Sequence, residues 1–251
     1  MISISTNYGS MFASKAAGAA QKTMNSAMEK LSSGMRINNA KDDAAGQGIA
    51  TRLTAEIMSL NMASRNASDA QAMIDTAEAA HQEVHAILLR MREIAVQASN
   101  GTLSDADRTA LDAEVSELET EITSIADNTA FAGIKLGTGV SVAFQIGTAN
   151  GNVLNHKFVD FDVSSIGANI AVNSVSTATA ALATIDGAIS TVSANRGTLG
   201  ALSNRLSSTI ANLDNISVNL SSARGRIQDT DFAQETSNLA KSQIMQQAAT
   251  A

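Results

Sequence analysis

Apolar residues recur at alternating steps of three and four over more than five heptads in the first half of the chain. Such a repeat predicts long helices that pack along their length, because it lines up one apolar stripe on each helix. The chain also contains no proline, and an interior proline would cost a helix about 3 kcal/mol. We therefore expect one helix over residues 44–98. Eleven of its twelve stepped positions are apolar: Leu60, Ala63, Ala67, Ala70, Ile74, Ala77, His81, Val84, Leu88, Met91, Ala95 and Ala98.

Two more segments carry the same pattern. Ser104 followed by Asp105 and Asp107 is typical of a helix start, because a serine cap and acids in the first turn both suit the helix dipole. From Leu182 to Leu220 a third stretch is apolar at nine of twelve stepped positions. We expect a mainly α fold, a long antiparallel helical bundle or coiled-coil rod with a small β-hairpin region in mid-chain. We call the apolar stripe of each predicted helix its seam. The seam of the second helix contains Leu111, Val115, Leu118, Ile122 and Ile125.

Residues 131–175 are glycine-rich and follow a different pattern. Val140, Val142, Phe144 and Ile146 alternate with small or polar residues, which predicts a strand. The sequence Ala149–Asn152 contains Asn-Gly, which favours a type I′ hairpin turn. We expect a second strand over residues 159–163, where valine and phenylalanine alternate with aspartate.

These patterns divide the chain into five segments: an N-terminal segment 1–43, two rod helices within 44–130, a β region 131–175, a rod helix within 176–222, and a C-terminal segment 223–251. The two end segments carry narrow apolar stripes among Ala, Ser, Asn and Gln. Such segments are expected to become ordered through contact with other subunits.

Composition excludes several classes of protein. The absence of cysteine excludes disulfides, a thiolate nucleophile and cysteine-ligated zinc. A net charge of −7 with no long Lys/Arg cluster argues against a nucleic-acid partner. No run of 18 apolar residues is present, so we expect no membrane span. The N-terminus lacks the basic and apolar regions of a cleavable signal peptide.

The segment His81–His85 is the strongest candidate for chemistry. Two histidines four residues apart on a helix can share a metal ion, but Glu83 stands midway between them and not beside either, as zinc-protease motifs require. His81 also falls on the helical seam, which favours a structural role. Asp42 and Asp43 are interpreted as a cap or an ion pair. We expect no catalytic, metal or cofactor site, and no enzyme.

Five longer motifs carry a family resemblance. Met28–Gly46 (MEKLSSGMRINNAKDDAAG) resembles the N-terminal signature of bacterial flagellins. Further segments resemble flagellin sequences in the same order along the chain: Leu89–Gly101 (LRMREIAVQASNG), Thr129–Leu136 (TAFAGIKL), Arg196–Ala201 (RGTLGA) and Ala223–Ala233 (ARGRIQDTDFA). The chain looks like a short flagellin without large outer domains, and it ends at Ala251, before the C-terminal helix of most flagellins is complete.

The resemblance implies a structural subunit that polymerises into the extracellular flagellar filament used for swimming, exported without a cleavable signal peptide. The implied partners are further copies of the chain, an export chaperone, and the hook-associated junction and cap proteins. In flagellins the two chain ends pair as helices in the filament core. The residues expected to make core contacts here are Ile4, Met11, Phe12, Met24, Met28, Leu31, Phe232, Leu239 and Ile244.

The resemblance also implies a second surface. Flagellins sensed by the host flagellin-specific Toll-like receptor use an arginine, an aliphatic residue four positions later and a glutamate on the next helix. Arg90, Ile94 and Glu114 match these positions, and Arg92 and Glu93 flank them. The same residues could instead serve subunit contacts. Three alternatives remain open: a hook–filament junction protein, a flagellin-like protease and a generic coiled-coil adaptor.

Overall fold

The computed structural model describes residues 7–250, which form two compact units. Unit 1 combines the N-terminal residues up to Met58 with the C-terminal residues from Asn215, and unit 2 contains Ser59–Asp214. Two long helices, α2 (Ala44–Ala98) and α4 (Val175–Gln228), contribute residues to both units. The helix predicted over residues 44–98 is confirmed at both of its ends.

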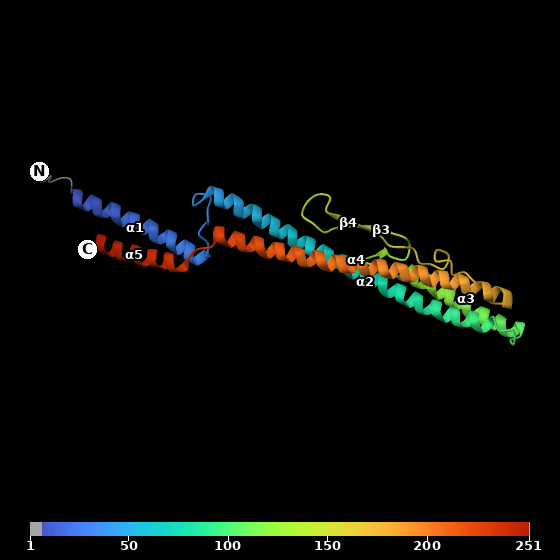
Figure 1. Cartoon of the computed structure of the whole chain (residues 1–251). Helices are drawn as coiled ribbons and strands as arrows, with labels where there is room; N and C mark the ends of the chain where they lie inside the picture. Colours follow the sequence, from blue (N-terminus) through green and yellow to red (C-terminus); the bar gives the residue numbers. More distant parts are fainter. Residues whose placement is uncertain (1–6, 251) are drawn as a thin grey trace. The chain divides into compact units, whose positions relative to one another are not determined.

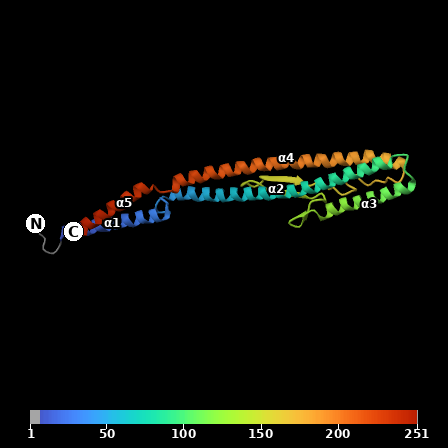
Figure 2. The same ribbon diagram turned by 90° about the horizontal axis from the view of Figure 1, so that it is seen from below.

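In unit 2, α2 and α4 lie side by side and antiparallel, with α3 (Asp105–Asn128) packed along them (Figure 2). Polar contacts record the antiparallel register, because Ser64 bonds Asp214, Glu78 bonds Arg196 and Arg92 bonds Asp186. The expected seams meet in one core. Its fully buried members include Val84, Leu88, Met91, Val115, Ile122, Ile185 and Val192.

The start of α3 confirms the predicted cap. The Ser104 hydroxyl accepts from the backbone N–H of Asp107 at 3.3 Å, and the Asp107 carboxylate accepts from the backbone N–H of Ser104 at 3.1 Å. This reciprocal pair satisfies two backbone donors that the first turn leaves without partners. At the start of α2, Asp43 Oδ1 accepts from the Gly46 N–H at 2.9 Å, so Asp43 acts as a cap.

The β region consists of two small antiparallel pairs, and Figure 1 labels the strands of the second pair. The strands β1 (Ala130–Phe131) and β2 (Ile134–Lys135) form the first, and β3 (Ser141–Gln145) and β4 (Val153–Lys157) form the second. Ser141 faces Lys157 and Gln145 faces Val153. Leu136, Leu154 and Phe158 are buried from this region against α2 and α4. The sheet therefore covers one stretch of the helical seam.

Two details of the predicted β region were wrong. The partner strand is β4, and residues 159–163 are not a strand. There the Asp160 and Asp162 carboxylates bond backbone N–H groups at Asp162 and Ser165, which breaks a sheet ladder, while Phe161 enters the helical core. The hairpin turn is also not type I′, because only Gly151 has positive φ (+92°), while the Asn152 N–H bonds the Ala149 carbonyl. That pattern is typical of a type II turn.

Unit 1 pairs the two ends of the chain. The helices α1 (Tyr8–Ser33) and α5 (Phe232–Thr250) lie side by side in both views (Figures 1 and 2). Gly34 ends α1 in the left-handed conformation, with φ +71°. Its carbonyl accepts from the Thr230 N–H at 3.0 Å, and the Arg36 N–H donates to the Gln228 carbonyl at 2.6 Å. These backbone bonds join segments that are far apart in the sequence.

By length and mean hydropathy α4 is apolar enough to cross a bilayer, the one such helix among residues 7–250. The sequence has no 18 consecutive apolar residues, which argued against a membrane span. The mean hydropathy of α4 is nevertheless high, because this helix has few charged residues and many alanines. Within unit 2 the apolar stripe of α4, including Ala178, Ile185 and Val192, is buried against other helices.

Candidate functional site

The contact between α1 and α5 is made by small and polar side chains. Ala20 and Ala27 on α1 and Ser242 on α5 are each at most 2% exposed. Beside them Lys30 Nζ lies 3.1 Å from Glu235 Oε1, and the Gln246 amide donates to Gln21 at 2.6 Å. Small residues let the two helices approach closely, but they bury little apolar area. The pairing therefore leaves most of the large hydrophobic residues of the two helices exposed, while Met24, Leu31 and Leu239 are half-buried.

Seven large apolar residues of the two helices are exposed. Met11 stands nine residues before buried Ala20, and Ile244 stands nine residues after buried Glu235. Nine residues turn a helix by about 180°, so Met11 and Ile244 both lie opposite the α1–α5 contact. We call the following residues the exposed apolar set, with exposures from 43% to 77%: Tyr8, Met11, Phe12, Met28, Phe232, Ile244 and Met245.

Five residues of this set were predicted as core contacts, and the structure places all five at the surface of unit 1. The other predicted contacts differ. Met24, Leu31 and Leu239 are half-buried, and Ile4 lies outside the described residues. Sequence analysis missed Tyr8 and Met245, although both are large residues within the same two helices.

In unit 2 a charged cluster lies on the surface of α2 and α3. Arg90 donates from Nε and Nη2 to Glu114 Oε1 at 3.0 and 2.7 Å, and from Nη1 to Glu93 Oε2 at 3.2 Å. Hydrogen bonding to Glu114, then to Glu93, raises the already high pKa of Arg90. The fork is thus held in one orientation while half of the Arg90 side chain stays exposed. The next arginine, Arg92, instead binds Asp186 of α4 at 2.7 Å.

Ile94 does not belong to this surface. Its side chain is 1% exposed and packs in the helical core, which corrects its assignment as an interface residue. The apolar side chains exposed on the same helix near Arg90 are Leu89 (45%) and Val96 (49%). The sequence could have indicated this exposure, because each of the two residues directly follows a seam residue. Its side chain therefore points about 100° away from the buried face of the helix.

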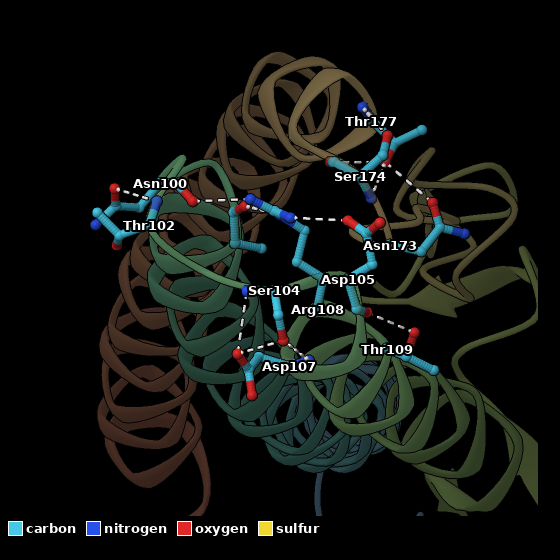
Figure 3. Close-up of polar contacts among 11 residues, drawn as sticks. Asn100, Thr102, Ser104, Asp105, Asp107, Arg108, Thr109, Asn173, Ser174 and Thr177 are labelled. Atoms are coloured by element: carbon cyan, nitrogen blue, oxygen red, sulfur yellow. Dashed lines mark hydrogen bonds and ion pairs between the residues drawn. The ribbon is translucent and has the colours of Figure 1, made fainter.

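The turn between α2 and α3 is built around a buried arginine (Figure 3). Arg108 is 4% exposed and donates to the carbonyls of Ala98 and Asn100, both at 3.0 Å, and to Asp105 Oδ1 at 3.1 Å. These donors satisfy carbonyls at the end of α2 that the helix leaves without partners. The end of the predicted helix 44–98 is therefore completed by a side chain that sequence analysis did not single out.

His81 is a core residue. It is 3% exposed, and its ring centroid lies 4.5 Å from that of Phe161. Burial lowers the pKa of His81 to about 4, against the smaller opposing effect of Glu78. His85 is half-buried. Within residues 7–250 no three His, Cys, Asp or Glu side chains converge on a possible metal site.

Comparison with known proteins decides the family. The bacterial flagellin N-terminal helical region matches residues 4–141, and the bacterial flagellin C-terminal helical region matches residues 182–251. The chain belongs to the bacterial flagellin family. A flagellin of Halalkalibacterium halodurans is 42% identical over 230 residues, which cover 90% of this chain and 85% of the relative.

Solved structures agree with this flagellin assignment. Bacillus cereus flagellin is 32% identical, with a TM-score of 0.55 over 59% of this chain and 88% of that chain. A protein assigned to the flagellar hook-associated class in Vibrio parahaemolyticus shares the fold, with a TM-score of 0.64 at 16% identity, over 75% of this chain and all of that one. This flagellin is accordingly a structural, non-enzymatic component of the extracellular flagellar filament.

Proposed function

We propose that the exposed apolar set of α1 and α5 forms the contacts by which this flagellin polymerises. The observation that supports this is that different residues of unit 1 face the two sides of the helix pair. Ala20, Ala27 and Ser242 are buried in the contact between the two helices. Met11 and Ile244 are exposed on the opposite side. A monomer gains nothing from this arrangement. A filament would bury the exposed side chains between neighbouring copies.

The energies fit repeated assembly. Fully burying a large apolar side chain contributes about 1.5–3 kcal/mol. Several such side chains per subunit could offset the entropy lost on association. A head-to-tail contact that does not close then repeats into a fibre.

The test is seeded assembly of the purified chain on short filament fragments, followed by electron microscopy. Phe12→Ala removes a side chain that is 77% exposed, so we expect an unchanged helix content in the monomer and a large loss of filament growth. Ser14→Ala is the matched control, because Ser14 is exposed on the same helix and small. Normal growth of the Phe12 variant would overturn the proposal for this residue.

We further infer that the Arg90 cluster binds the host flagellin-sensing Toll-like receptor. Arg90 and Glu114 match the family positions for that role, and the fork of Arg90 is held by two carboxylates while half of its side chain remains exposed. An oriented guanidinium can donate to carbonyls or carboxylates of a partner without a further loss of rotamer freedom. Leu89 and Val96 supply apolar area on the same helix, in place of buried Ile94.

A receptor-reporter cell assay tests this role. Arg90→Ala should lower signalling at least about tenfold, which corresponds to the loss of one charge-assisted contact. Arg65→Ala, an exposed arginine on the same helix, is the matched control and should signal normally. Equal signalling by the Arg90 variant and the unmodified chain would refute the receptor role and leave Arg90 and Glu114 to subunit contacts.

We also propose, from family membership, that an export chaperone and the hook-associated junction and cap proteins bind this chain. Export in this proposal uses the secretion channel of the flagellum. Co-purification of the chain with the export chaperone of its own host would test it, and failure to bind at micromolar concentrations would count against it.

A further inference from the structure

A small cavity lies in unit 2 where α2, α4 and the end of β4 meet. Its volume is about 70 Å³. Phe158 and Leu199 form part of its wall, but His81, His156, Asn195 and Thr198 also line it. The cavity is thus partly polar although it sits within an otherwise apolar seam.

Two nitrogen atoms of the lining residues are buried without a protein partner. They are Nδ1 of His81 on α2 and Nδ2 of Asn195 on α4. His81 as a whole is 3% exposed. A buried polar atom without a hydrogen bond costs free energy, so most such atoms in folded proteins have a partner.

The chemistry of the two atoms is complementary. Asn195 Nδ2 can only donate, whereas Nδ1 of a neutral imidazole with its proton on Nε2 can only accept. A water molecule accepts from the first and donates to the second. An amide nitrogen is not a metal ligand, and no carboxylate lines the cavity.

We propose that this cavity is a binding site for ordered water, one molecule or a short chain, that joins His81 of α2 to Asn195 of α4. A buried water molecule needs a cavity volume of about 10–15 Å³, and this cavity of about 70 Å³ is large enough. The bridge would connect two helices that share no direct hydrogen bond between these side chains.

The charges around His81 are compatible with a neutral ring. Glu78 and Arg196 pair with each other at 2.7 Å, and their effects on His81 are opposite in sign. Lys157 and His156 line the cavity, and burial lowers the pKa of His156 as well. A neutral ring with its proton on Nε2 leaves the Nδ1 lone pair of His81 free to accept at neutral pH.

The first test is a double-mutant cycle on the whole chain at pH 7, using His81→Leu, Asn195→Leu and the double variant. Each substitution changes the unfolding equilibrium constant by some factor. If water couples the two side chains, the factor for the double variant should be smaller than the product of the two single factors, by about threefold or more. His85→Leu combined with Asn195→Leu is the matched control, because His85 does not line the cavity. For that control pair, the factor for the double variant should equal the product of the two single factors.

The second test is a high-resolution crystal structure of the unmodified chain. Ordered water should lie within hydrogen-bonding distance of His81 Nδ1 and of Asn195 Nδ2. The proposal requires both results. A dry cavity, another ligand in it, or effects of the first pair that simply multiply would each overturn it.

Discussion

Protonation of the buried His81 ring should destabilise unit 2 as the pH falls from 7 to 4. The pKa of His81 is about 4 in the folded chain, against 6.5 for an unperturbed histidine, because burial disfavours the imidazolium. Between these two values the unfolded chain binds a proton that the folded chain does not. Stability is therefore fully present above pH 6.5 and is lost as the pH falls towards 4.

The size of the effect follows from the two pKa values. They differ by about 2.5 pH units, and each unit corresponds to about 1.4 kcal/mol, so the full loss should be about 3.5 kcal/mol, of which about 3 kcal/mol is reached at pH 4. That is a large part of the stability of a typical domain. Below about pH 4 the His81 contribution should stop changing.

The perturbation that isolates this effect is His81→Leu, which has a similar volume and no titrating group. Burial also lowers the pKa of His156, and hydrogen bonds lower the pKa values of Asp42, Asp107 and Asp162, so these groups destabilise the fold in acid as well. Their effects cancel when the variant is compared with the unmodified chain at each pH.

The assay is urea unfolding followed by circular dichroism from pH 7 to pH 4, with an NMR titration of the three histidine rings. Relative to the unmodified chain, the variant should gain about 3 kcal/mol in its free energy of unfolding as the pH falls. The His81 ring should titrate near pH 4. A ring that titrates near 6.5, or a stability difference that does not change with pH, would refute the reasoning.

Three further substitutions test the packing of unit 2 by urea unfolding. Arg108→Ala leaves the Ala98 carbonyl and its neighbours without a buried donor and should cost about 3 kcal/mol, while a loss under 1 kcal/mol would contradict the role of the turn. Gly137→Ala drives a methyl group into the backbone of Ala126 and should cost about 1–3 kcal/mol, and a neutral result would show that the close approach is wrong. Ser104→Ala removes the capping box and should cost about 1 kcal/mol, with no loss expected if the cap is absent in solution.

The helices of this flagellin could be predicted from the sequence because their signals are local. The seam of α2 depends only on spacing, and the cap of α3, formed by Ser104 and Asp107, lies within four residues. The position of α4 followed from the same periodicity, although its last turns, up to Gln228, were not predicted. These interactions need no knowledge of distant contacts.

Other features depend on tertiary contacts and could not be predicted. Phe161 leaves the expected strand because the helical core accepts it, and Ile94 is buried because α3 and α4 close over it. Arg108 looks like an ordinary surface arginine in the sequence, and only the fold brings the carbonyls of Ala98 and Asn100 to it.

The surface of α1 and α5 could be predicted from the sequence only in part. Sequence patterns placed apolar residues in both helices, but could not say which ones the pair itself would bury. The structure gives that answer, since Ala20 and Ser242 are buried while Phe12 and Ile244 are exposed.

Seeded filament growth measures the central claim most directly. Purified chain is added to short filament fragments, and filament length is followed by electron microscopy for the unmodified chain, Ile244→Ser and the control Ser14→Ala. The account predicts long filaments for the unmodified chain and the control, and stalled growth for Ile244→Ser with an intact helical monomer. Growth of Ile244→Ser at the unmodified rate, together with normal growth of Phe12→Ala, would contradict the claim that these exposed side chains make the filament.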